Sequence, residues 1–286
     1  MDSSLDIPPL NPVALLKAHQ INPKKGLGQN FLIDASALKK IVTAAEVSPG
    51  DCVLEIGPGL GSLTRYLAQS CRRLVAVELD HHLVPILREV VSPWTNVEIV
   101  EGDILQQNPA QLINEDGYLV VANIPYYITS AVIRHLLESQ VKPARMVLTM
   151  QLEVAQRICA QPGDLSLLAL SIQVYGAPRS VLRIPAGAFY PAPKVDSATL
   201  RVDLYPQPLI PTDQIEVFFR LAKAGFSQKR KTLRNAMSGG LALPREQVEQ
   251  FLASANIDPQ RRAETLSIAE WKDVTAAFIR AKNPSA

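Results

Sequence analysis

The residues Val53-Leu54-Glu55-Ile56-Gly57-Pro58-Gly59-Leu60-Gly61 connect a short apolar run to a helical pattern. Cys52–Ile56 has the apolar character of a buried strand, and Leu60–Gln69 has the spacing of a helix. Glycines in the connecting turn allow a sharp change of direction and bring backbone N–H groups close to a ligand. Their Gly-x-Gly-x-Gly spacing differs from the Gly-x-Gly-x-x-Gly of pyrophosphate-binding turns. A tight turn that binds nothing is the alternative interpretation of this stretch alone.

Short apolar runs and helical patterns alternate on both sides of this turn, and Asp34 is placed to cap a helix before it. Continuous apolar strands between helices are typical of a parallel sheet covered on both faces, so the predicted fold class is α/β. The further predicted strands are Leu74–Val77, Val97–Val100, Leu119–Ala122, Met146–Met150, Val181–Ile184 and Ala198–Leu204. The further predicted helices are His82–Val91, Ser130–Leu137, Thr212–Ala224, Lys231–Met237, Arg245–Ala253 and Ile268–Ala281.

The chain of 286 residues suits a catalytic domain with a smaller partner. We expect residues 1–23 to form a flexible N-terminal tail and residues 24–205 to form the α/β domain. Prolines follow at 206, 208 and 211, and only helical patterns come after them, so residues 206–286 are predicted as an all-helical C-terminal domain.

Composition excludes several classes of protein. The apolar fraction of 47% excludes a disordered or fibrous chain. No run of about 18 apolar residues is present, so no membrane span is expected. The N-terminus lacks the patterns of a signal or transit peptide. Three cysteines lie far apart without metal or redox spacing. We therefore expect a cytoplasmic protein without a metal site.

The formal net charge of +2 is unevenly distributed along the chain. Residues 205–286 contain 12 Lys/Arg and 8 Asp/Glu, whereas the preceding residues contain 17 and 19. A basic end on a slightly acidic body favours a polyanionic partner that is contacted mainly at that end. A solvated helix face is the alternative explanation. The basic run consists of Lys223, Lys229, Arg230, Lys231 and Arg234.

Three acidic side chains follow three consecutive predicted strands, namely Glu55, Glu78 and Asp103. Because the carboxyl ends of parallel strands meet at one edge of a sheet, these side chains should line one crevice. Glu55 would repel a pyrophosphate and favour a cation, Glu78 suits two ribose hydroxyls, and Asp103 suits an adenine amino group. With backbone groups of Gly57 and Gly59 they predict a site for S-adenosylmethionine, an adenosine that carries a positive charge.

Asn123-Ile124-Pro125-Tyr126 follows the next strand and suits methyl transfer to a planar exocyclic amine. The side-chain oxygen of Asn123 and the carbonyl of Ile124 would accept the amine protons and aim the nitrogen lone pair at the methyl group. Pro125 stiffens the turn, and Tyr126 offers a face on which a base can stack. A rigid turn with a packed tyrosine is the alternative. An amine of this kind in nucleic acid must be flipped out or lie in a loop.

Two residues of the later Ala188–Asp196 segment are candidates near such a base. Phe189 would close its other side, with a plain core position as the alternative. Lys194 would contact phosphate, with bracing of its own loop as the alternative.

In combination, these segments resemble the KsgA type of rRNA adenine N6-dimethyltransferases from Lys24 to Trp271. The motifs that carry the resemblance are Lys25–Leu32, the glycine-rich turn, Glu78, Asp103, Asn123–Tyr126, Pro191–Ser197, Phe226–Arg234 and Arg262–Ser267. One departure is Gln161–Ser166, which is shorter than the usual family segment and lacks its tyrosine and arginine. That departure bears on RNA contacts of this loop and leaves the chemistry at Asn123 unaffected.

The resemblance implies a Rossmann-like S-adenosylmethionine-dependent methyltransferase sheet with a small helical domain. It implies N6,N6-dimethylation of two adjacent adenosines in the hairpin loop near the 3′ end of small-subunit (16S) rRNA. The implied substrate is a pre-30S particle, and the implied state is a monomer without membrane or metal. By similarity, the cofactor is contacted by Asn30, Leu32, Gly57, Glu78, Asp103 and Asn123. Asn123, Tyr126 and Phe189 would hold the target adenine, and the basic residues of the helical end, Lys229, Arg230, Lys231 and Arg234, would contact rRNA.

Three other functions remain open at this point. A related resistance methyltransferase acts on large-subunit rRNA, but the forms of Pro193–Ser197 and Arg262–Leu266 favour the small-subunit enzyme. A non-catalytic binder that kept the fold is disfavoured by the intact acids and Asn123. A small-molecule methyltransferase is disfavoured by the basic C-terminal segment, because phosphate contacts make binding depend on salt.

Overall fold

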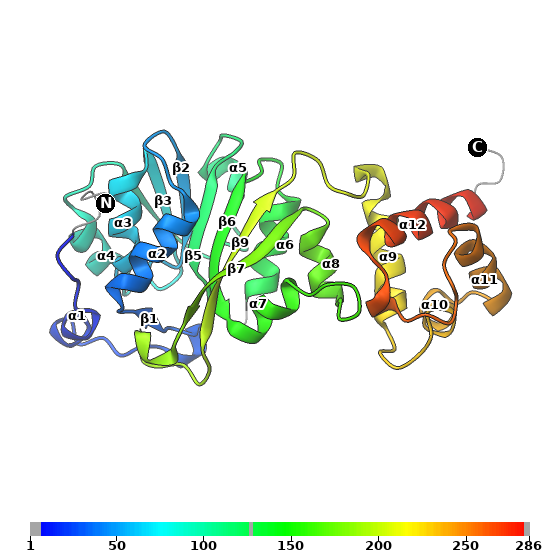
Figure 1. Ribbon diagram of the computed structural model, residues 1–286. Helices are drawn as coiled ribbons and strands as arrows, with labels where there is room; N and C mark the ends of the chain where they lie inside the picture. The colour runs from blue at the N-terminus through cyan, green and yellow to red at the C-terminus, as the bar shows by residue number, and fades with distance from the viewer. Residues whose placement is uncertain (1–6, 126–127, 283–286) are drawn as a thin grey trace. The chain divides into compact units, whose positions relative to one another are not determined.

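The computed structural model describes residues 7–125 and 128–282. The chain divides into two compact units (Figure 1). The first comprises the chain up to Ala155 together with Pro178–Leu204. The second comprises Gln156–Ala177 together with the chain from Tyr205 onward. No helix within the described ranges is long and apolar enough to span a membrane.

A seven-stranded sheet forms the centre of the first unit, in the order β4-β3-β2-β5-β6-β9-β7. The strands β2 to β6 are parallel, and β9 is antiparallel to β6. From β2 the chain adds β3 and β4 on one side and then β5 and β6 on the other, so the strand order reverses between β2 and β5. In open α/β sheets, ligands bind beyond the carboxyl ends of the strands at such a reversal. The strands are β2 (Cys52–Ile56), β3 (Arg73–Glu78), β4 (Val97–Glu101), β5 (Leu119–Asn123), β6 (Arg145–Gln151), β7 (Gly176–Ile184) and β9 (Ser197–Leu204).

A separate two-stranded ribbon is formed by β1 (Phe31–Leu32) and β8 (Phe189–Tyr190), which pair antiparallel. The register places Phe31 opposite Tyr190 and Leu32 opposite Phe189. Two segments that lie far apart in the sequence are therefore side by side. The helices of the first unit are α1 (Pro12–Ala18), α2 (Ala35–Ala45), α3 (Ser62–Ser70), α4 (Val84–Val91), α5 (Pro109–Leu112) and α6 (Thr129–Glu138); α7 (Leu152–Ile158) spans the division between the units.

The central strands are buried on both faces, as the continuous apolar runs predicted. Val53 and Val121 pack on one face together with Ile41 of α2. Leu54 and Val120 are their neighbours in the two strands, point to the opposite face and are fully buried as well. The α/β prediction is therefore confirmed. Because both faces of the sheet are covered, a ligand can reach the central strands only at their ends.

Element boundaries agree with the prediction where the local signal is strong. Asp34 caps α2 by accepting a hydrogen bond from the N–H of Ala37 at 2.9 Å. The next helix begins at Ser62 and not at Leu60, because Gly61 has φ of +84° and cannot be a helical residue.

We predicted a flexible tail over residues 1–23. The structure corrects this prediction for residues 7–23, the part of the segment that it describes. Pro12–Ala18 is a helix, and its Leu16 is buried against apolar side chains of the first unit. The guanidinium of Arg65 on α3 also donates to the carbonyl of Pro8 at 2.7 Å. The segment is ordered because its short helix has an apolar side to bury.

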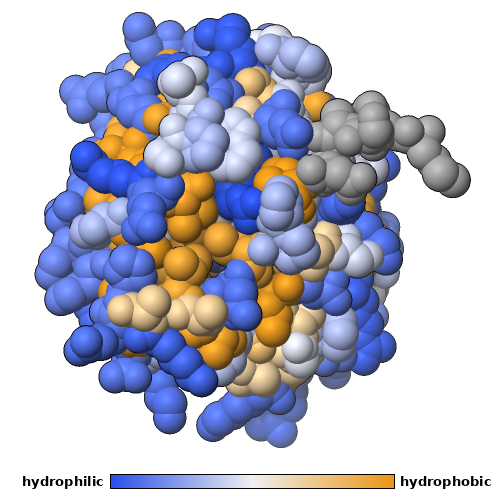
Figure 2. Space-filling model, turned by 90° about the vertical axis from the view of Figure 1, so that its left-hand side faces the viewer, coloured by the Kyte–Doolittle hydropathy of each residue, from blue (hydrophilic) through white to orange (hydrophobic). Residues whose placement is uncertain are grey.

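On the face of the molecule that Figure 2 shows, apolar side chains gather near the centre and hydrophilic side chains surround them.

The second unit is helical and has its own hydrophobic core, in which Phe218, Leu252 and Trp271 are buried. Its last described helix is amphipathic and brings Trp271 into this core. The prediction of an all-helical C-terminal region is confirmed. The helices are α8 (Leu167–Gln173), α9 (Ile215–Phe226), α10 (Leu233–Leu241), α11 (Arg245–Ser254) and α12 (Ile268–Lys282), with short 3-10 turns at η4 (Thr212–Gln214) and η5 (Ala263–Thr265).

The boundary predicted at residue 205/206 agrees within one residue with the division between Leu204 and Tyr205. The assignment of Gln156–Ala177 to the first domain is corrected, because this segment belongs to the second unit. Leu170 of α8 is fully buried in the core of that unit. The N–H of Tyr205 donates to the carbonyl of Tyr175 at 2.9 Å. This bond joins the start of the proline-containing segment to the chain directly after α8. Apolar packing of α8 decides its membership, and no break in composition marks the start of this segment.

Candidate active site

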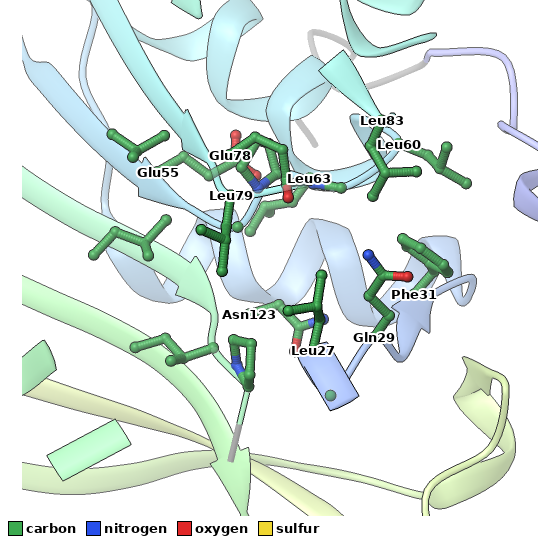
Figure 3. A pocket seen from close by; sticks show the side chains of 18 of the residues that line it. Leu27, Gln29, Phe31, Glu55, Leu60, Leu63, Glu78, Leu79, Leu83 and Asn123 are labelled. Carbon is green, nitrogen blue, oxygen red and sulfur yellow. Dashed lines mark hydrogen bonds between the residues drawn. The ribbon is translucent and has the colours of Figure 1, made fainter. Parts of the chain in front are cut away.

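A cleft opens beyond the carboxyl ends of β2 and β5, where the strand order reverses. It encloses about 1060 Å³, including space that is open to solvent. Figure 3 shows Glu55 and Glu78 projecting from neighbouring strands, with Leu27 and Asn123 on the other side of the cleft. Every residue that the sequence predicted for the cofactor lines this cleft, namely Asn30, Leu32, Glu55, Gly57, Gly59, Glu78, Asp103 and Asn123.

The glycine-rich turn forms one wall of the cleft in a conformation that excludes most side chains. Gly57 and Gly59 have φ of +69° and +59°, in the left-handed region. A Cβ atom added to Gly59 would lie 3.0 Å from the Phe31 ring. The backbone of the turn therefore approaches the β1 segment more closely than any other residue would permit.

Both carboxylate oxygens of Glu78 accept backbone hydrogen bonds. Oε2 accepts from the N–H of Gly59 at 2.9 Å, and Oε1 accepts from the N–H of Asp80 at 2.8 Å. Burial raises the pKa of Glu78, while the backbone hydrogen bonds oppose this increase. A carboxylate has about four acceptor positions, so this one can still accept bonds from two hydroxyl groups. The geometry fits the predicted contact with a ribose.

Glu55 is 1% exposed and lies at the inner end of the cleft. Its Oε2 has no hydrogen-bond partner among the described residues. Burial raises the pKa of Glu55 to about 8, and the nearby Glu78 carboxylate contributes to the increase. Without a ligand, the carboxyl group is therefore mostly protonated at pH 7. A bound cation would favour its ionised form, which fits a positively charged cofactor.

Asp103 begins the turn that follows β4 and lines the cleft. Its Oδ1 accepts the N–H of Leu105 at 3.0 Å. The same turn is attached to α6, where Nε2 of His135 lies 2.8 Å from the carbonyl oxygen of Gln107. These contacts hold the Asp103 carboxylate at the cleft, as its predicted contact with an adenine amino group requires.

The side chain of Asn123 lies at the end of β5 and faces the cleft. Its Nδ2 donates to the backbone carbonyl of Asn30 at 3.1 Å. This bond fixes the orientation of the amide, and Oδ1, the only acceptor atom of the side chain, is available to accept protons from a substrate. Pro125 also lines the cleft, whereas the predicted stacking residue Tyr126 lies outside the described residues.

Phe189 occupies the core position that the sequence analysis gave as the alternative, and its stacking role stays a prediction. Its side chain is 3% exposed and belongs to the hydrophobic cluster around Leu32 and Leu38. It does not line the cleft. The exposed aromatic residue of this ribbon is its neighbour Tyr190, which is 37% exposed and opposite Phe31. Alternation of side chains across a strand explains why one aromatic ring is buried and the next is not.

The basic candidates for RNA contact differ in how they are held. Lys194 is an exposed residue of the first unit. The segment between α9 and α10 exposes three of the predicted residues, Lys229, Arg230 and Lys231. Arg234 is the exception, because its Nη1 donates to Oε1 of Glu249 at 2.6 Å. It takes part in an ion pair of the second unit, and its phosphate contact stays a prediction.

Several residues at the cleft were not predicted individually. Leu27, Gln29 and Phe31 line it, and Lys24 and Gln29 bond to the buried carboxylate of Asp80. The available signal was the Lys25–Leu32 motif, but the motif did not reveal its bonding partner, since Asp80 follows a different strand.

Comparisons with known proteins agree with this geometry. The family model described as ribosomal RNA adenine dimethylase matches residues 20–279. Two curated relatives are named ribosomal RNA small subunit methyltransferase A. The one from Dehalococcoides mccartyi is 47% identical over 272 residues, covering 94% of this chain and 92% of the relative. The one from Alkaliphilus metalliredigens is 40% identical over 276 residues, covering 94% and 96%.

Two solved structures are also similar. The 23S rRNA methyltransferase ErmE has a TM-score of 0.70 and 29% identity, covering 87% of this chain and 100% of that one. A dimethyladenosine transferase from Plasmodium falciparum has a TM-score of 0.75 and 23% identity, covering 88% and 98%, and supports the fold alone. The Rossmann-like methyltransferase fold is confirmed, and the chain belongs to the ribosomal RNA adenine dimethylase family.

Proposed function

We propose that this protein transfers methyl groups from S-adenosylmethionine to N6 of two adjacent adenosines in the 3′-terminal hairpin loop of small-subunit rRNA. Each adenosine becomes N6,N6-dimethyladenosine. Membership of the adenine dimethylase family and the small-subunit relatives support this substrate. The observation that carries the proposal is the amide of Asn123, which Asn30 holds beside a cleft lined by acidic side chains.

The acidic residues of the cleft would hold the cofactor by its adenosine and its positive charge. Glu78 would accept the ribose hydroxyls, Asp103 the adenine amino group, and Glu55 would balance the cationic part. The unpartnered, buried oxygen of Glu55 supports a cationic ligand there. When bound, S-adenosylmethionine supplies the methyl group and the positive charge that makes it transferable.

The protein's part in the transfer is mainly to position the amine. Oδ1 of Asn123 and the carbonyl oxygen of Ile124 would accept the amine protons, which directs the nitrogen lone pair into the cleft. Pro125 restricts the turn that carries both groups, and Tyr126 would stack on the base. No strong base is needed, because the nitrogen proton becomes acidic on methylation and leaves to water. Positioning and electrostatics therefore account for most of the rate.

Contacts with rRNA would come from Lys194 and from the exposed basic segment 229–231. We propose a monomeric cytoplasmic enzyme that acts on a pre-30S particle. The target adenines must be unstacked to enter the cleft, and bases in a hairpin loop meet that requirement at low cost.

The experiment that tests this function is incubation with labelled S-adenosylmethionine and unmethylated 30S particles, followed by mapping of the modified nucleotides. Similarity to ErmE makes large-subunit rRNA the second candidate, so 50S-derived rRNA belongs in the same assay. We expect two dimethylated adenosines in the small-subunit rRNA and none in the large. The reverse pattern would refute the assignment, and label in neither RNA would point to a non-catalytic binder.

A further inference from the structure

A buried carboxylate beside the cleft has no part in the function proposed above. Asp80 follows β3, and its side chain is 1% exposed. Oδ1 accepts from Nζ of Lys24 at 2.8 Å, and Oδ2 accepts from Nε2 of Gln29 at 2.8 Å. Nδ1 of His82 lies 3.1 Å from Oδ1 and 3.0 Å from Nζ of Lys24. Burial favours the neutral acid, but bonds from Lys24 and Gln29 outweigh it and lower the pKa of Asp80 to about 2.

Both main partners of Asp80 belong to one short segment, residues 24–30, which we call the N-terminal loop. Within it, Oε1 of Gln29 accepts the N–H of Lys24 at 2.7 Å, so the two partners also hold each other. The backbone of the loop turns sharply at Gly28, which has φ of +63°. Its residues 27–30 line the cleft. Asp80 is therefore bonded to both ends of a loop that forms part of the site.

The same loop contacts the amide that would position the substrate. The residue after Gln29 is Asn30, whose carbonyl oxygen accepts Nδ2 of Asn123 at 3.1 Å. Asp80 also donates its own N–H to Glu78 at 2.8 Å. A continuous set of hydrogen bonds thus runs from the Glu78 carboxylate through Asp80 and the loop to Asn123. A displacement of the loop would remove the bond that fixes which atom of the Asn123 amide faces the substrate.

We propose that Asp80 is a positioning residue that holds the N-terminal loop against the cleft and thereby orients the amide of Asn123 toward the target amine. The inference rests on the proposed methyl transfer for its effect on rate. The loop placement itself depends only on the bonds described. Asp80, His81 and His82 have ligand atoms close enough together to suggest a metal site. The ammonium of Lys24 already bonds to the Asp80 oxygen, so a metal cation would have to displace it.

The test compares Asp80→Asn with a matched control, Glu98→Gln. Asparagine keeps the size of Asp80 but removes its charge and one acceptor. Glu98 pairs with Arg73 at 2.7 Å at the opposite end of β3, and it is exposed. Gln29→Leu is a second variant that removes one bond to Asp80 without placing a new group in the buried position. Turnover on 30S particles is measured well below the melting temperature and at saturating S-adenosylmethionine, with hydrogen exchange of the backbone followed in parallel.

We expect Asp80→Asn and Gln29→Leu to lower kcat about tenfold or more, in line with the cost of misplacing a reacting group. Their double variant should cost no more than the worse single variant, because both break the same contact. Exchange in residues 24–30 should become faster in both and stay unchanged in Glu98→Gln. Unchanged kcat, a loss confined to the KM for S-adenosylmethionine, or additive effects would each overturn the proposal. If the wild-type protein modifies no rRNA, the proposed function fails, while unaltered exchange in the loop would still overturn the placement by Asp80.

Discussion

Cofactor affinity is expected to rise with pH up to about 8, and Glu55 is the residue that causes the rise. Its pKa is about 8 in the ligand-free protein, because burial disfavours the charged form and the nearby Glu78 carboxylate adds to the increase. About one tenth of the molecules carry the ionised form at pH 7, and about one hundredth at pH 6. If a cationic ligand binds the ionised form, the apparent Kd falls about tenfold between these values, which corresponds to about 1.4 kcal/mol.

The sign follows from proton counting. In the unfolded chain Glu55 has a pKa near 4.3, so between about pH 4.3 and 8 the folded protein binds more protons than the unfolded chain. The contribution of Glu55 to stability is therefore greatest at low pH and is lost as pH rises through the folded pKa. A bound cationic cofactor would stabilise the ionised carboxylate, so the group loses its proton on binding. About 0.9 proton should therefore be released per cofactor at pH 7.

The assay is titration calorimetry of S-adenosylmethionine binding between pH 6 and 8.5 in buffers of different ionisation enthalpy. Glu55→Gln keeps the shape of the side chain and should show neither proton release nor the tenfold change per pH unit. His81 and His82 are present in both proteins, so the difference between the profiles isolates Glu55. S-adenosylhomocysteine keeps the ammonium group but lacks the sulfonium charge, and it identifies which charge Glu55 balances. A wild-type Kd that is equal at pH 6 and 8, or a variant with the wild-type slope, would refute the reasoning.

Three further outcomes are expected. Asn123→Ala should abolish methylation while particle binding, measured by co-sedimentation, stays largely intact; wild-type methylation would contradict its role. Arg201 is 5% exposed and bonds two carboxylates that are themselves partly exposed, so Arg201→Ala should lower the free energy of unfolding by about 2 kcal/mol through the lost charged hydrogen bonds. Arg72 forms an exposed ion pair with Glu115, so Arg72→Ala should lower the free energy of unfolding by less than about 1 kcal/mol. Denaturant titrations measure both variants, and equal losses for Arg72→Ala and Arg201→Ala would contradict the effect of burial. Alanine throughout segment 229–231 should reduce the slope of log K against log salt by about two to three for phosphate contacts; an unchanged slope would indicate a solvated surface.

The parts of the fold that depend on local pattern were predictable. Largely apolar runs of four to seven residues marked the strands, and Asp34 marked a helix start through its own side chain. The acids at three strand ends also came together as expected, because parallel strands end at a common edge. In each case the physical cause lies within a few residues or in a general property of the sheet.

The sequence did not reveal the surroundings of residues whose neighbours lie elsewhere in the chain. Phe189 and Tyr190 are both aromatic, and only pairing with β1 decides which is buried. Arg234 belongs to a basic run, yet Glu249 from the next helix engages it. The helix within residues 156–177 has the pattern of many amphipathic helices, and its apolar face packs in the second unit.

Sequence alone was sufficient for the alternation of strands and helices, the glycine-rich turn and the acidic and amide residues that line the cleft at the strand ends. Their pattern repeats with the period of the backbone, and the edge of a parallel sheet collects whatever follows its strands. The tertiary structure decided the protonation of Glu55, the orientation of Asn123 and the bonding of Asp80. Burial and hydrogen-bond partners determine these properties, and the partners come from segments about 50 to 90 residues away along the chain.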